Sequence, residues 1–192
     1  MRLGTAFVLA TICTATSANA ALTVIGQGPA HDCYVAALHD YGAGSGEDIC
    51  SLALDSAPLN LRDRAATLVN RGVIRTRLGR LEAALSDDDQ AIAIGRYLSP
   101  SDLGVAYVNR ASVLNGLGRS REAFDSASRG LSLGATNPEI GYYARAVAEE
   151  RLGDIKAAYH DYKQAIGIDP NFTPAARQLS RFRVDGRPAE RS

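Results

Sequence analysis

The sequence predicts an all-α protein, an α-solenoid of stacked helical hairpins that a single capping helix closes at its C-terminal end. Three stretches align with one another without gaps, at residues 65–98, 104–137 and 139–172. Each stretch carries a Leu-Gly pair, and a small residue follows five positions after the glycine. A repeat of this length corresponds to one helical hairpin, which cannot bury its own apolar face and must stack on its neighbours.

Residues 1–20 have the features of an export leader. Arg2 gives a positive start, residues 3–15 form an apolar run, and a small-x-small cleavage site ends at Ala20. The apolar run is shorter than the roughly 20 residues that a membrane-spanning helix needs. Cys13 offers a lipoprotein as an alternative, although the residue before it is bulky where a small one would be expected. We therefore expect cleavage after Ala20 and a periplasmic or secreted protein.

The composition narrows the classes of partner. The 192 residues carry 21 basic and 21 acidic side chains. This balance gives no support for nucleic acid or an anionic membrane as partner, so we expect a protein or peptide. After the leader, the sequence contains no segment long and apolar enough to span a bilayer. We expect neither a cofactor nor a metal, and the sequence does not determine the oligomeric state.

Residues 21–60 are predicted to form a degenerate first hairpin. One helix begins near Pro29 and contains Cys33, and a second helix contains Cys50. Export would place both thiols in an oxidising compartment, where two cysteines usually form one disulfide. The glycine-rich stretch at 42–46 is expected to be a flexible turn, because a phosphate-binding loop needs a preceding strand and a following Lys-Ser or Lys-Thr.

Residues 61–172 are predicted to form the three repeats, each with a helix, a tight turn and a second helix. Gly79, Gly118 and Gly153 should close the first helices, because glycine adopts the left-handed conformation without a steric penalty. Small residues on facing sides should let the two helices of each hairpin approach closely. These facing pairs are Gly72 with Ala84, Ala111 with Ala123, and Ala146 with Ala158.

The joints between the repeats carry signals that start a helix. Residues 99–102 read Ser-Pro-Ser-Asp, with a capping serine, a proline in the first turn and an acidic residue three positions after the serine. Asn137, Pro138 and Glu139 are expected to play the same role at the second joint.

Together these positions resemble the tetratricopeptide repeat family, whose unit of about 34 residues has the same pattern of small residues and Leu-Gly. The third copy fits best, through Tyr142, Ala146, Gly153, Ala158, Tyr162, Ala165 and the closing Asp169, Pro170 and Asn171. The other copies depart from the pattern: Asp88 and Ala127 stand where an aromatic residue usually packs, and Gly130 replaces an alanine. The resemblance implies a stack that binds partner proteins.

The chain is predicted to end in a capping helix at 173–184 and a flexible tail at 185–192. A Thr-Pro pair starts the helix, and Ala176, Leu179 and Phe182 are expected to face inward. Repeat stacks need such a lid, with a polar outer face, to stay soluble.

One arginine recurs at the same place in all three repeats. Asp87 follows Arg71 by sixteen residues, Asp161 follows Arg145 at the same interval, and a serine stands there in the middle repeat. The repeated spacing predicts a charge-assisted bond between the two helices of a hairpin. The alternative is a row of arginines that binds a ligand. Residues 87–89 are three consecutive aspartates, which we expect to be a solvated acidic face with Asp87 turned toward Arg71.

No set of residues in the sequence predicts catalysis. His31, Cys33, His39 and Cys50 have the ligand types of zinc, but their spacing matches no common zinc finger. His160 has no serine or cysteine placed for it to activate. We expect no enzyme activity, and a metal-binding or hydrolytic protein that uses the first four residues is an alternative.

The first helix of each repeat is expected to form the inner, concave face and to bind a peptide or helix of an envelope partner. The predicted residues of this face are Val69, Val73, Arg77, Val108, Ser112, Asn115, Tyr143, Val147, Glu150 and Arg151. An apolar centre with a polar fringe suits an amphipathic segment. Two other interpretations are open: the valines only pack one hairpin on the next, or the apolar face closes on a second copy to give a homo-oligomer.

Overall fold

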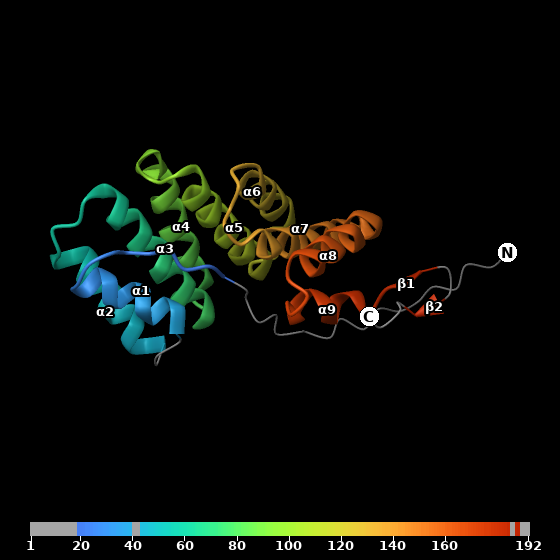
Figure 1. Cartoon of the computed structure of the whole chain (residues 1–192), viewed down its shortest axis with the longest axis horizontal. Coiled ribbons are helices and arrows are strands. Elements are labelled where there is room, and N and C mark those ends of the chain that lie inside the picture. Colours follow the sequence, from blue (N-terminus) through green and yellow to red (C-terminus); the bar gives the residue numbers. More distant parts are fainter. Residues whose placement is uncertain (1–18, 40–42, 185–186, 189–192) are drawn as a thin grey trace.

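The computed structural model of the chain describes residues 19–39, 43–184 and 187–188. Apart from one short strand pair near the C-terminus, the described part is an all-α stack. Its hairpins follow one another in chain order, from α1 and α2 at one end to α8 and α9 at the other (Figure 1). The helices are α1 (Pro29–His39), α2 (Ala43–Ser56), α3 (Leu61–Arg77), α4 (Leu81–Ala93), the 3₁₀ helix η1 (Gly95–Tyr97), α5 (Pro100–Gly116), α6 (Ser120–Ser132), α7 (Pro138–Leu152), α8 (Ile155–Ile168) and α9 (Thr173–Leu179). In these residues, we find no helix whose length and apolar character would let it cross a membrane.

The three central hairpins turn at the predicted glycines. Gly79, Gly118 and Gly153 have φ angles of 72°, 75° and 90°, which are left-handed values that side chains other than glycine rarely adopt. In the first of these turns, the Gly79 N–H donates to the carbonyl of Thr76 at 3.0 Å, so an end carbonyl of α3 is satisfied. The prediction that these glycines close the first helices is confirmed.

Glycine at position 130 is required by the close approach of α5 and α6. A Cβ atom on Gly130 would lie 2.7 Å from the carbonyl oxygen of Gly104 and 2.7 Å from a methyl of Val108. A Cβ on Gly104 would in turn lie 2.9 Å from the carbonyl oxygen of Gly130. The departure from the usual alanine therefore lets the two helices of the second repeat come into backbone contact.

The two joints between hairpins differ in how they start the next helix. Ser99 caps α5 as predicted, because its hydroxyl accepts a 3.1 Å hydrogen bond from the N–H of Asp102. Asn137 stands at the N-cap of α7 and Glu139 lies in its first turn, so the predicted helix start is confirmed, but the Asn137 side chain makes no capping hydrogen bond. Its side-chain amide instead lies 3.5 Å from the Glu139 carboxylate, and Pro138 supplies the first helical residue.

The glycine-rich stretch after α1 is helical from Ala43 onward, so the predicted flexible turn is wrong for residues 43–46. Residues 40–42 lie outside the described part of the chain. Gly46 is buried, and a Cβ added there would lie 3.2 Å from the Ala36 side chain and 3.3 Å from Ile74. The small residue therefore lets α2 approach α1 and α3 closely.

The last helix is shorter than predicted, because α9 ends at Leu179 and the expected helix continued to about residue 184. Ala175, rather than the predicted Ala176, is buried against α8, while Leu179 and Phe182 pack against the same cluster. Beyond α9, β1 (Arg183–Val184) pairs antiparallel with β2 (Arg187–Pro188). The rest of the predicted flexible tail, residues 185–186 and 189–192, lies outside the described part.

Candidate interaction face

The chain's own N-terminal segment, residues 20–24, lies extended across α3 and α5. Figure 1 shows this segment in blue, crossing α3 in the direction of α5. Its alternate residues Ala20, Leu22 and Val24 are buried, with no more than 7% of any of them exposed. They belong to one apolar cluster with residues of α3 and α5 that include Val69 and Val108. We call the surface under this segment the α3–α5 face.

Two asparagines hold the main chain of the segment. The Leu22 N–H donates to Oδ1 of Asn70 at 2.7 Å, and Nδ2 of Asn70 donates to the Leu22 carbonyl at 2.8 Å. Asn109 binds Ala20 in the same way, with distances of 3.1 Å and 2.8 Å. Each asparagine therefore satisfies both main-chain groups of one residue.

The two asparagines are equivalent in the repeat and fully enclosed by the fold. Asn70 on α3 and Asn109 on α5 both stand at the sixth position of their repeats, and Ala144 stands there in the third. At most 1% of either asparagine is exposed. A buried amide that loses its partners costs about 1–3 kcal/mol, so both amides need hydrogen-bond partners, which the segment supplies here.

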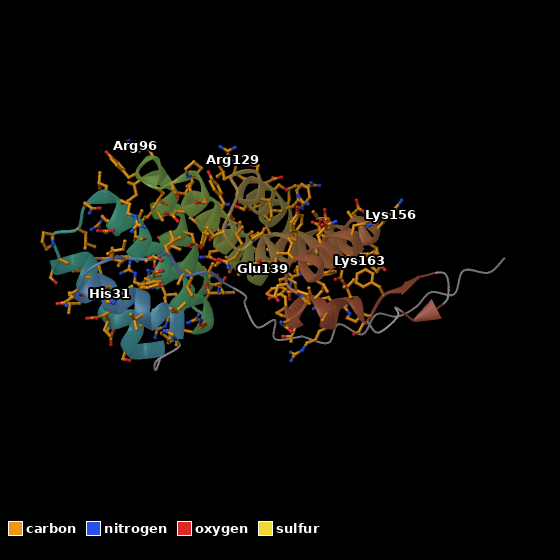
Figure 2. The ribbon with its side chains drawn as sticks, viewed as in Figure 1. His31, Arg96, Arg129, Glu139, Lys156 and Lys163 are labelled. Atoms are coloured by element: carbon orange, nitrogen blue, oxygen red, sulfur yellow. A yellow bond between two sulfur atoms is a disulfide. The ribbon has the colours of Figure 1, made fainter. Side chains whose placement is uncertain are left out.

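Two further side chains hold the end of the segment nearest α1. Arg62 donates to the carbonyl of Thr23 at 2.7 Å. The ring of His31, labelled in Figure 2, donates through Nδ1 to the carbonyl of Val24 at 2.9 Å. Hydrogen bonds from side chains, rather than a sheet ladder, therefore fix this extended backbone.

The structure places the predicted concave residues in two groups. Val69, Val73 and Val108 are buried, and Val69 and Val108 share the cluster that the N-terminal segment joins. Val73 packs among residues of the first hairpin, and a methyl of Val108 lies against Gly130 and Gly141, so these two valines pack one hairpin on the next and offer no surface to a partner. Among the other predicted residues of α3 and α5, Arg77 is exposed, Ser112 is half-buried, and Asn115 is buried and donates to the carbonyl of Ala144 at 2.7 Å.

The predicted residues of α7 are partly accessible. Val147 and Glu150 are half-buried and Arg151 is exposed, while Tyr143 is buried with its ring 5.6 Å from that of Phe172. Glu150 accepts a 3.0 Å hydrogen bond from the Tyr162 hydroxyl, and Arg151 donates to the carbonyl of Asn115. This end of the stack therefore presents a polar surface with an apolar side chain beside it.

Arg71 and Arg145 bind the aspartates that lie sixteen residues after them, as the repeated spacing predicts. Arg71 donates to both carboxylate oxygens of Asp87, at 3.0 Å and 2.8 Å. Arg145 binds both oxygens of Asp161, at 2.6 Å and 3.0 Å. Each pair joins the two helices of one hairpin. These contacts leave no row of unpaired cations at Arg71 and Arg145.

Comparisons with known proteins find similarity to repeat proteins in sequence and in fold. Residues 141–172 match the tetratricopeptide repeat family. The sequence-similar proteins include sperm-associated antigen 1A of Danio rerio, which is 34% identical over 147 residues, 73% of this chain and 33% of that protein. The chain thus spans about a third of that relative's length. The crystal structure of MamA has a similar fold, with a TM-score of 0.61, 17% identity, and coverage of 81% of this chain and 83% of MamA.

The tetratricopeptide repeat pattern does not predict that a second arginine, Arg75, binds Asp87. Arg75 donates to the same carboxylate at 2.8 Å and to Glu47 of α2 at 2.9 Å. Arg75 lies four residues after Arg71 and therefore on the same side of α3. This spacing could have predicted that Arg75 also contacts Asp87. In the middle repeat, Arg110 contacts the predicted serine at 2.9 Å and also Asp89 of the preceding hairpin at 2.6 Å.

Two carboxyl groups are buried without adequate pairing. Both oxygens of Asp88 lack a hydrogen-bond partner among the described residues, and burial raises the pKa of this group well above its usual range. The expectation of a solvated acidic face is therefore wrong at Asp88, which is fully buried, whereas Asp87 is turned toward Arg71 as expected and Asp89 is exposed. Burial, with a smaller effect of Asp161, also raises the pKa of Glu149 to about 7.

The cysteines and histidines of the first hairpin do not come together as a metal site. Cys33 and Cys50 are fully buried beside each other, with a Cα–Cα distance of 4.7 Å. His31 binds the N-terminal segment, and His39 is exposed at the end of α1. Across the described ranges, no group of three or more His, Cys, Asp or Glu side chains is arranged to hold a metal ion.

Proposed function

We propose that this chain is an exported protein–protein interaction module that holds a segment of an envelope partner on the first helices of its repeats. The observation that carries the proposal is the extended segment already lying on the α3–α5 face, with its main chain bound by Asn70 and Asn109. The repeat match at residues 141–172 supports the same class of function. The partner's segment would extend toward α7, where Val147 and Arg151 are accessible.

Export is part of this proposal and rests on the leader pattern of residues 1–20. An oxidising compartment would let Cys33 and Cys50 form a disulfide, and their Cα distance of 4.7 Å lies within the range that disulfides use. Closing a loop of this size contributes about 3 kcal/mol to stability. The disulfide would reinforce the degenerate first hairpin, whose helices contain few large apolar side chains.

Site-specific photocrosslinking in intact cells tests the proposal. A photoreactive residue at Val147 or Arg151 should capture a partner protein, whereas the same residue at Lys156 should not. Lys156 is a matched control, because it is exposed on a second helix and projects outward from the stack, as do Arg96 and Arg129 (Figure 2). Equal capture at all positions, or capture at none, would contradict the proposed binding face.

A further inference from the structure

The N-terminal segment has the geometry of a bound peptide rather than of an ordinary structural strand. The hydrogen bonds of Asn70 and Asn109 with the segment go to the main-chain groups of Leu22 and Ala20, so they do not depend on which side chains the bound residues carry. Extended peptides are recognised in this way, with main-chain bonds supplying affinity and alternate side chains supplying specificity.

The register of the segment matches the spacing of the two asparagines. Asn109 binds residue 20 and Asn70 binds residue 22, so successive hairpins bind alternate residues of one extended chain. Residues two apart in a strand point to the same side. Ala20, Leu22 and Val24 accordingly face the helices, while the Thr23 side chain is exposed.

The connection between the segment and α1 has the features of a hinge. Gly26 and Gly28 have φ angles of 119° and 101°, and an added Cβ would meet no atom within 4 Å at either position. Ile25, which precedes them, is 85% exposed. Rotation at the two glycines would let the segment leave the α3–α5 face, with loss of the contact between Val24 and His31 of α1.

We propose that residues 20–24 of the full chain are a built-in occupant of a peptide site, which an extended partner peptide replaces. In the exported form, cleaved after Ala20, residues 21–24 would remain as the occupant, held through the contact of Leu22 with Asn70. The partner would present a small side chain where Ala20 lies and branched apolar side chains where Leu22 and Val24 lie, and its intervening residues would be unrestricted. This inference rests on the proposed function and adds the class of partner and the competitor that it must displace. Binding of the partner is then opposed by the chain's own segment.

Fluorescence anisotropy with a labelled peptide of residues 19–26, capped at both ends, tests this competition on the full chain. Leu22→Asp should detach the segment, because a carboxylate cannot be buried in the apolar cluster. This variant should bind the peptide at least tenfold more tightly than the unaltered chain. Thr23→Asp is the matched control, because it adds the same charge at an exposed position of the segment and should behave like the unaltered chain.

Two additions identify the site that binds the peptide. Asn70→Ala in the Leu22→Asp background should reduce binding at least tenfold, and a peptide of the same composition in scrambled order should bind at least tenfold more weakly. If a Leu22→Asp chain with unchanged circular dichroism binds no peptide, or binds the scrambled peptide equally well, the proposal is wrong. This experiment needs no natural partner, so its failure is distinct from a failure of crosslinking at Val147.

Hydrogen exchange of the unaltered full chain gives an independent test that does not depend on how a variant folds. A segment that detaches at its hinge should exchange the amides of Ala20 and Leu22 at least tenfold faster than the core amides of α3 and α5. If these two amides exchange only as fast as those core amides, the segment leaves only when the whole protein unfolds. That result would overturn the proposal.

Discussion

Asn109 on α5 holds the main chain of Ala20, a residue 89 positions earlier, with both the oxygen and the nitrogen of its side-chain amide. The sequence places Ala20 at the end of the leader, yet in the full chain this residue is buried in the apolar cluster of the α3–α5 face. The bond that an export peptidase would cut, between Ala20 and Ala21, therefore lies between the two asparagine contacts. Cleavage would have to precede packing of the segment.

The contact between Asn109 and Ala20 can be measured by comparing two chains, one that begins at Asn19 and one that begins at Ala21. Asn109→Ala should lower the free energy of unfolding of the longer chain by about 1–3 kcal/mol, because it leaves the main chain of Ala20 unpaired. The same substitution should have a much smaller effect in the shorter chain, where Ala20 is absent. Urea unfolding of all four proteins gives the coupling energy. Equal effects in both chains would show that Asn109 does not bind Ala20.

Breaking the ion pair of the third hairpin should destabilise the protein. Asp161→Ala leaves Arg145 partly buried without a counter-charge, and we expect a loss of about 3 kcal/mol in the free energy of unfolding. Glu122→Ala is the control, because it breaks the exposed pair with Arg119 and should change stability little. An Asp161→Ala protein with unchanged stability that had lost only its partner would support a ligand-binding role for Arg145 instead.

Glu149 should make stability depend on pH around neutrality. Its pKa is raised to about 7 in the folded protein, so folding favours the protonated carboxyl. The associated stabilisation is complete below the ordinary pKa of a glutamate and is lost as the pH rises through about 7. Glu149→Gln should therefore stabilise the protein relative to the unaltered chain more at pH 8 than at pH 5, as measured by thermal unfolding. A difference that does not change with pH would contradict the burial of a titrating carboxyl at this position.

Reduction should weaken the protein if Cys33 and Cys50 are bonded in the exported form. We expect a reductant to lower the free energy of unfolding by about 3 kcal/mol and to expose two thiols to alkylation, which mass spectrometry can count. The Cys33→Ala, Cys50→Ala double variant should be insensitive to the reductant. Two free thiols in native protein isolated from the cell envelope would exclude the disulfide.

The elements that could be predicted from sequence depend on local spacing. The turn at Gly79 follows from a glycine at a fixed distance from apolar residues, and the contact of Arg71 with Asp87 follows from an interval that recurs in another repeat. Each of these features lies within one hairpin, so the sequence of a single repeat is enough to predict it.

The role of the N-terminal segment could not be predicted because it depends on contacts between distant parts of the chain. Asn70 and Asn109 are visible in the sequence as equivalent positions of two repeats. Their role in binding the segment becomes apparent only when the structure places Leu22 and Ala20 beside them. Five residues with alternating burial are too short to predict a strand, and they overlap the leader pattern. The burial of Asp88 could not be predicted for a similar reason, because it depends on how neighbouring helices pack against this residue.

The most direct test of this account is the hydrogen-exchange protection of the Leu22 amide, measured by NMR in the unaltered chain and in Asn70→Ala. The account predicts that this amide exchanges more slowly than an exposed amide in the unaltered chain, and that Asn70→Ala removes the protection. A Leu22 amide that exchanges at the rate of an unstructured peptide in the unaltered chain would contradict the account.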